Sequence, residues 1–267
     1  MNSADIPQHL LTHETVHRSG TRSLSRALKL ARVVASRPVM GWRLADLAVA
    51  CDLDRGTVHR MLACMVAERF VEQRATDRHY LPGPLMFELG LALPQHTRYH
   101  QNAQAIITQL AHRMCGVVIF LLRSGNEFVC SARAGACELA GAMVHVGARR
   151  PLITSAGGVA ILQTLDAGAQ HVITAENVAQ EIKRHGTSRL DGINRMLSRS
   201  AHFGFGVNLG DVASGLHAFG VPVRDKLGET FAGLCLIGPP ERYGESRIDE
   251  LHHVLSQVAT DLQAFAA

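Results

Sequence analysis

The sequence predicts an α+β protein in two parts: a small domain of helices and a hairpin, then a larger mixed sheet flanked by helices. Residues 42–69 carry apolar positions at helical spacing in two segments, and two short β-prone runs follow directly. From residue 117 onward, apolar strand runs alternate with amphipathic helical segments. The length of 267 residues, 47% of them hydrophobic, fits two domains or one large one.

The stretch 42–69 predicts two helices joined by a tight turn at 51–53, with Asp54 placed to cap the second helix. That helix has an apolar stripe at i, i+3, i+4 and i+7, which comprises Val58, Met61, Leu62 and Met65. Its opposite face carries short or cationic side chains, namely Arg55, Gly56, Thr57, His59 and Arg60. Such a face suits a helix that enters a DNA major groove, but a solvated polar face of an ordinary helical hairpin has the same pattern.

The flanking segments favour the DNA-binding interpretation. A preceding helix is predicted over 23–36, with its core face formed by Leu24, Ala27, Leu28, Ala31 and Val34. Its other side is lined by Arg22, Arg26, Lys29, Arg32 and Arg37, which are either solvated or in contact with phosphates. Two strands at 70–74 and 79–81, with Asp77 as turn former, complete a winged helix. Arg74, Arg78 and His79 at the wing tip and Arg43 before the second helix join the expected DNA contacts.

The distribution of charge agrees with this interpretation. Residues 1–85 hold 12 Lys and Arg against 8 Asp and Glu, whereas residues 86–267 hold 15 against 15. The basic excess, although small enough to arise by chance, therefore lies where a polyanion would bind. The expected domains are a flexible arm (1–21), a winged helix-turn-helix (22–85), a linker segment (86–100) and a second domain (101–267). The helix of the linker is expected to end at Pro94.

The second domain is predicted as a mixed sheet with a small-molecule pocket between the sheet and its covering loops. Strands are expected at 117–122, 127–131, 141–146, 216–223 and 230–237. Helices are expected before Cys115, after the glycine-rich start at Ala156-Gly157-Gly158, over 166–203 with a capping box at 188–191, and over 245–265. The glycine-rich helix start suits either an anionic ligand or close packing.

Enzymes and membrane proteins are not favoured. No apolar run approaches the roughly 20 residues of a membrane span, and the N-terminus lacks a signal-peptide layout, so a cytoplasmic protein without membrane contact is expected. The six cysteines form no Cys-x-x-Cys pair, which indicates reduced thiols. His9, His13 and His17 recur every four residues, but no carboxylate or thiol cluster completes a metal site. The rival hypothesis is an enzyme in which Ser155 is the nucleophile and His145, His171 or His185 is its base. The sequence contains no nucleophile-elbow or metal-binding motif, so no catalytic residue or cofactor is expected.

Several motifs together resemble those of a known family. They are Leu53-Asp-Arg-Gly-Thr-Val-His-Arg-Met-Leu62, Ala67-Glu-Arg-Phe-Val71, Val146-Gly-Ala-Arg-Arg-Pro-Leu152, Gly204-Phe-Gly206, Gly215, Val221-Pro-Val-Arg-Asp225 and Gly238-Pro239. The order and spacing of these motifs over residues 22–265 resemble those of the IclR family of bacterial transcriptional regulators. The resemblance implies a GAF-like effector domain, duplex operator DNA as partner, a homodimer that often pairs into a tetramer, and control of a catabolic operon.

The resemblance also implies an effector, usually a small organic acid from aromatic or central carbon catabolism. The positions that match effector-lining residues are Ala156, Gly157, Asn208, Leu216, Ala218, Cys235 and Ile237. The chain departs from the family at Val159, where a lysine is common, at Asp211, where a glutamate is usual, and in Gly-Phe-Gly, which replaces Gly-Tyr-Ala. Most of the matched positions are apolar, which implies a bulkier, less hydrophilic effector. The alternative is a ligand-independent regulator whose second domain only dimerises.

Overall fold

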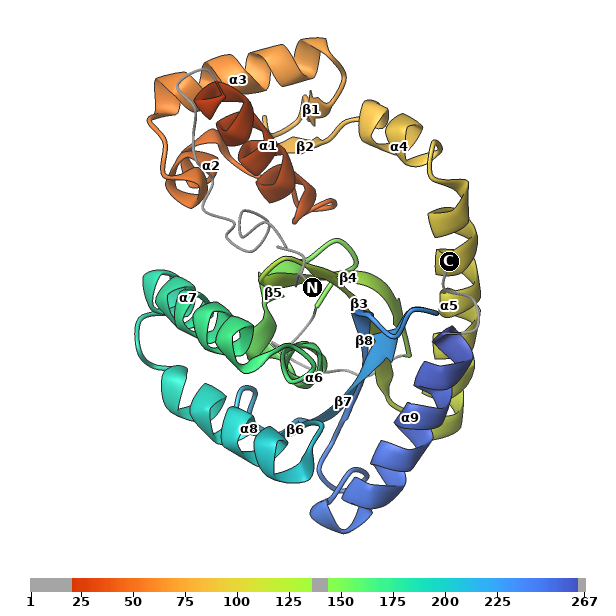
Figure 1. Cartoon of the computed structure of the whole chain (residues 1–267). Helices are drawn as coiled ribbons and strands as arrows, with labels where there is room; N and C mark the ends of the chain where they lie inside the picture. The colour runs from red at the N-terminus through yellow and green to blue at the C-terminus, as the bar shows by residue number, and fades with distance from the viewer. Residues whose placement is uncertain (1–20, 136–143, 264–267) are drawn as a thin grey trace, which may run out of the picture. The chain divides into compact units, whose positions relative to one another are not determined.

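The computed structural model describes residues 21–135 and 144–263 (Figure 1). They belong to two compact units, with the boundary between Met86 and Phe87. The α+β class is confirmed, because the first unit is helical with a small hairpin and the second is built on a six-stranded sheet. The expected N-terminal arm, with its three histidines, lies outside the described residues. Within the described part of the chain, no helix is long and apolar enough to cross a membrane.

The first unit is a winged helix-turn-helix. Its elements are α1 (Arg22–Ala35), α2 (Leu44–Cys51), α3 (Arg55–Ala67), β1 (Val71–Gln73) and β2 (Tyr80–Pro82). The two strands pair antiparallel, and the backbone of Trp42 adds two hydrogen bonds to Tyr80, of 3.0 and 2.8 Å. This pairing ties the segment before α2 to the wing.

Local sequence explains the turn between α2 and α3. Asp52 adopts a left-handed conformation with φ of 58°, which ends α2 and reverses the chain. The carboxylate of Asp54 then accepts a hydrogen bond of 2.8 Å from the Thr57 backbone N–H, as predicted for a helix cap. Val58 and Leu62 are fully buried, with Met61 and Met65 packed against the same core, so the predicted stripe is confirmed.

The predicted core face of α1 is partly wrong. Leu30, Ala31 and Val34 are buried, whereas Leu24 and Leu28 are 60% and 55% exposed. The reason is that α1 packs on α2 and β2 through a face centred on Leu30, which the predicted stripe omitted. The two exposed leucines form a separate apolar stripe one helical turn apart.

The predicted linker helix over 86–100 is also corrected. A short helix α4 spans Pro84–Gly90, and a long helix α5 spans Pro94–Met114. Pro94 therefore begins a helix instead of ending one, because proline at the first helical position loses no intrahelical hydrogen bond. Consequently α5 continues through the expected domain boundary at residue 100.

Besides α5, the described residues of the second unit contain one curled sheet and six further helical segments. Its remaining elements are β3 (Val117–Ser124), β4 (Glu127–Ala134), β5 (Arg149–Pro151), η2 (Leu152–Thr154), α6 (Ala156–Leu162), α7 (Ala167–His185), α8 (Leu190–Phe203), β6 (Gly206–Leu209), β7 (His217–Arg224), β8 (Thr230–Gly238), η3 (Glu245–Arg247) and α9 (Ile248–Gln263). The strand order is β5-β4-β3-β8-β7-β6. Every described pair is antiparallel, so the expectation of a mixed sheet is wrong. Tight turns join β3 to β4 and β7 to β8, and such turns produce antiparallel neighbours.

Helices cover both faces of this sheet (Figure 1). On one face α5 and α9 enclose Phe120, Phe219 and Leu236. The other face, here named the α6 face, is covered by α6, α7 and α8, and its core includes Ile119 and Cys235. The final helix buries the residues predicted from its spacing, which are Ile248, Leu251, Leu255, Val258 and Leu262.

Two local predictions in the second unit need correction, and two short strands were missed. The strand expected at 141–146 lies partly outside the described residues, and 144–146 are not in a strand. The capping box at 188–191 does not form, because Ser188 Oγ donates to the His185 carbonyl and Arg189 occupies the cap position. Strands β5 and β6 were not predicted, since three and four residues give too short a pattern to detect.

Candidate nucleic-acid interface and ligand-binding region

The face of α3 that lies away from the core is open. Arg55, Gly56, His59 and Arg60 are exposed, and Thr57 is half-buried. Arg60 Nη2 donates a hydrogen bond of 3.1 Å to Thr57 Oγ1. Hydrogen bonds from Thr57 lower the pKa of Asp54 and keep the cap ionised. This arrangement offers a cationic surface at the N-terminal end of a helix that a core stripe holds in place.

A notch of about 310 Å³ lies beside this surface. Its lining comes from α2, α3 and the wing: Arg43, Leu44, His59, Gln73, Asp77, Arg78 and Tyr80. Three predicted DNA-contacting residues, Arg43, His59 and Arg78, therefore meet in one place. Gln73, which the sequence did not single out, donates 3.1 Å to the Arg78 carbonyl and supports the wing tip.

Two predicted wing contacts have partners inside the protein. Arg74 donates to both carboxylate oxygens of Asp77 and to the carbonyls of Val39 and Met40, at 2.6 to 3.1 Å. His79 Nδ1 lies 2.9 Å from the Asp77 carboxylate. The Arg74 guanidinium holds the pKa of Asp77 well below its usual range. Arg74 and His79 thus fix the shape of the wing, because their polar groups are already bound.

The cations of α1 divide in the same way. Arg22 and Arg26 are exposed. Lys29 Nζ instead donates 3.0 Å to the Cys51 carbonyl, and the Arg37 guanidinium stacks 3.7 Å over the Trp42 ring. Only part of the basic side of α1 is therefore available for phosphates.

The predicted effector-lining residues gather largely on the α6 face. Asn208, Ala218 and Ile237 lie side by side in register across β6, β7 and β8. Ala156, Ala218 and Cys235 belong to one buried cluster, and Leu216 is buried just before β7. Asn208 Oδ1 accepts from the backbone N–H groups of Asp211 and Val212, so its carbonyl oxygen already stabilises a turn.

The start of α6 packs directly on the sheet. A side chain at Gly220 would place its Cβ 2.4 Å from the Gly157 backbone nitrogen, and one at Gly206 would meet the Ala156 carbonyl at 1.9 Å. Burial raises the pKa of the Cys235 thiol to about 12, and a hydrogen bond with the Gly157 backbone lowers this pKa by a smaller amount. The glycines at this end of the α6 face therefore permit close contact between helix and strands, which favours the packing interpretation.

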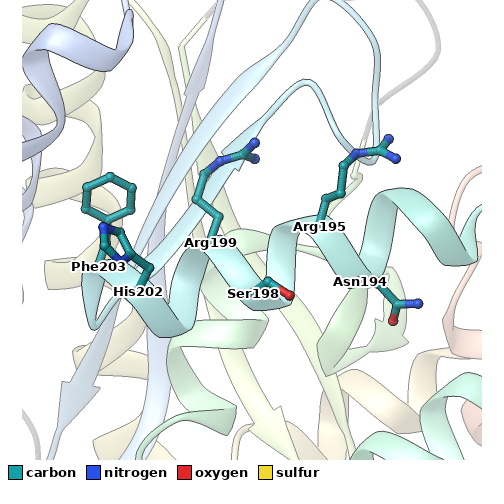
Figure 2. A pocket seen from close by; sticks show the side chains of 6 residues that line it. All are labelled: Asn194, Arg195, Ser198, Arg199, His202 and Phe203. Carbon is teal, nitrogen blue, oxygen red and sulfur yellow. The ribbon is translucent and has the colours of Figure 1, made fainter.

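A separate open groove of about 550 Å³ runs along α8 (Figure 2). It is lined by Asn194, Arg195, Ser198, Arg199, His202 and Phe203. Arg195 and Arg199 point to the same side of the helix and both form ion pairs with Asp211. This groove contains none of the predicted effector residues.

Ser155, the nucleophile of the rival enzymatic hypothesis, has a structural role. Ser155 Oγ accepts 3.0 Å from the Gly158 backbone N–H and caps α6. Within residues 21–135 and 144–263, no three His, Cys, Asp or Glu side chains gather as a metal site. The described cysteines are all free, with Cys51, Cys130 and Cys235 buried and Cys64 and Cys115 exposed.

Comparison with known proteins gives consistent matches over both units. The IclR helix-turn-helix domain matches residues 23–75, and the bacterial transcriptional regulator IclR C-terminal domain matches residues 94–264. The regulator BhcR of Paracoccus denitrificans is 22% identical over 91% of this chain and 86% of its own length. The repressor AllR of Escherichia coli K12 is 21% identical over 93% of this chain and 92% of its own.

Solved structures show the same fold. An IclR family regulator from Brucella abortus aligns with a TM-score of 0.69 and 18% identity over 92% of both chains. An IclR homolog from Microbacterium hydrocarbonoxydans, solved with 4-hydroxybenzoate, aligns with a TM-score of 0.65 and 18% identity over 91% of this chain and 98% of the other. The family's DNA-binding domain and its C-terminal domain are both matched, in this order, and the matched proteins named here are transcriptional regulators. The chain therefore belongs to the IclR family of DNA-binding transcriptional regulators.

Proposed function

We propose that this regulator is ligand-responsive: it binds operator DNA through α3 and the notch beside it, and senses a small organic acid at the α6 face of the second unit. The observation that supports sensing is the arrangement of that face. Asn208, Ala218 and Ile237 come from three strands and lie in one row, next to a buried apolar cluster. A mostly apolar site with few polar groups is typical of small-molecule binding. The homolog solved with 4-hydroxybenzoate supports an aromatic acid as one class of effector for a catabolic operon.

Self-association is part of the proposal. Leu24 and Leu28 are exposed one turn apart on α1, and Phe87 is 71% exposed on α4. Exposed apolar residues grouped on a helix favour contact with another copy of the chain. Sedimentation equilibrium of the full chain gives the number of subunits directly.

The sensing function is tested by thermal unfolding of the full chain with benzoate, 4-hydroxybenzoate, pyruvate or glyoxylate. A ligand that binds only the folded state stabilises it by about 2.7 kcal/mol at a concentration 100 times its Kd. We expect at least one acid to raise the melting temperature and to change the affinity for a duplex selected by the wild-type protein from a random pool. If no acid does either, while DNA binding persists, the ligand-independent alternative with a purely dimerising second domain is favoured.

A further inference from the structure

One arginine on the α6 face is outside the set predicted from the family resemblance. Strand register pairs Arg150 of β5 with Phe128 of β4. Paired residues project to the same side of a sheet, so Arg150 lies on the side of Phe128 and Cys130, both fully buried in the α6-face cluster. The preceding residue, Arg149, projects to the opposite side of the strand.

The two neighbouring arginines differ in their partners. Arg149 donates 2.7 Å to Ser124 Oγ and 3.3 Å to the Glu127 carboxylate. Arg150 has no hydrogen bond or ion pair with any residue in the described part of the chain. The nearby acid, Glu181, is almost fully buried and forms its ion pair with Arg189 at 2.9 Å. Burial lowers the pKa of Arg150, and the positive charge of Arg189 adds to this effect.

A half-buried guanidinium without a partner is energetically unfavourable, because charges removed from water are normally paired. Among the described residues, the charge of Glu181 favours the Arg150 guanidinium, but the Glu181 carboxylate is already paired with Arg189. Burial raises the pKa of the Cys130 thiol to about 12, so this thiol is neutral. A carboxylate would satisfy Arg150 well, since the planar guanidinium matches two carboxylate oxygens. Phe128, which is paired with Arg150 across the strands, belongs to a buried apolar cluster that also includes Val144 and Ile153, and such a cluster suits a hydrocarbon or aromatic body.

We propose that Arg150 receives the carboxylate of the effector, whose apolar body lies along the α6 face. The inference rests on the proposed sensing function and specifies its ligand as a monocarboxylate with an apolar body. It also places the effector's carboxylate at Arg150 instead of at the glycine-rich start of α6. The backbone N–H of Gly157 is covered by Gly220 and Cys235, so the start of α6 offers it no binding site.

The experiment compares Arg150→Met with the matched control Arg149→Met in the full chain. Each protein is titrated calorimetrically with benzoate, 4-hydroxybenzoate and the neutral isostere benzamide. Hydrogen bonds to charged groups stabilise by roughly 1.5–3 kcal/mol, so Arg150→Met should weaken binding of the acids by about 10- to 100-fold. Binding of benzamide should not change, and Arg149→Met should bind the acids as the wild type does.

A second readout separates ligand binding from structural support. Without ligand, Arg150→Met should keep or raise the melting temperature because it removes a half-buried cation that forms no ion pair within the described residues, whereas Arg149→Met should lower it. Wild-type affinity for the acids in Arg150→Met would overturn the role of Arg150 and leave the sensing function standing. Binding of neither acid by the wild type would overturn this inference, and the sensing function would fall with it only if pyruvate and glyoxylate also have no effect on the melting temperature or the DNA affinity. A fall in melting temperature for Arg150→Met as large as that for Arg149→Met would show that Arg150 supports the fold.

Discussion

The DNA-contacting surface of the first unit and the α6 face of the second are assembled in opposite ways. The first is exposed, and much of it comes from two turns of α3. The second is largely buried and is built on a six-stranded sheet, where strand register brings distant residues together, as it does for Arg150 and Phe128. The comparison teaches that a site on one helix can be predicted from spacing, whereas a site on a curled sheet depends on pairing between distant segments. It also predicts different outcomes of substitution in the two regions.

The largest effect is expected where α6 contacts the sheet. In Gly220→Val, the new side chain would begin 2.4 Å from the Gly157 nitrogen and 2.5 Å from the Ala156 carbonyl carbon, so backbone atoms would have to move. We expect the free energy of unfolding of the second unit to fall by about 4 kcal/mol or more. Urea unfolding followed by circular dichroism measures this loss.

The control for that substitution is Gly90→Ala in α4, where an added Cβ meets nothing within 4 Å. Gly90→Ala should change the free energy of unfolding by no more than about 1 kcal/mol. The change should be an increase, because alanine has a higher helix propensity than glycine. If Gly220→Val unfolds like the wild type, α6 is not packed this closely on the sheet. The start of α6 would then have room for a ligand, and the contrast between the two regions would weaken.

This contrast explains what the sequence could and could not predict. The stripe containing Val58 and Leu62, and the Asp54 cap, depend on contacts within a few residues and are confirmed. The bonds of Arg74 within the first unit were not predicted, because its partners include the carbonyls of Val39 and Met40, more than thirty positions away. Arg149 and Arg150 look equivalent in the sequence, and only the pairing of β4 with β5 separates them.

The next largest effect concerns DNA affinity. Thr57→Ala and Arg60→Ala should each lose roughly 1–3 kcal/mol of specific binding if they contact bases, at little cost in stability. Because Arg60 donates a hydrogen bond to Thr57, the double variant should lose less than the sum of the single losses. Fluorescence anisotropy with the selected duplex gives all three values. Specific binding that survives in both single variants would show that another element reads the bases.

The smallest effects are expected in the wing, where Arg78 and Arg74 should differ in their roles. Arg78 lines the notch, so Arg78→Gln should weaken DNA binding and reduce the salt dependence of log affinity by about one unit. Arg74 is bound inside the wing, so Arg74→Gln should lower the melting temperature instead. A reduced salt slope for Arg74→Gln at unchanged stability would reverse the assignment of the two residues.

The pH dependence of the Arg74→Gln effect tests its cause. The Arg74 guanidinium and the His79 backbone N–H depress the pKa of Asp77 in the folded chain, whereas an unfolded Asp titrates at about 3.9. A depressed carboxyl contributes stability above the unfolded pKa and loses it as the pH falls through the folded pKa. The difference in melting temperature between wild type and Arg74→Gln should therefore be constant above about pH 5 and shrink as the solution becomes more acidic. A difference that persists unchanged under acid would attribute it to the hydrogen bonds from Arg74 to the Val39 and Met40 carbonyls, which do not titrate.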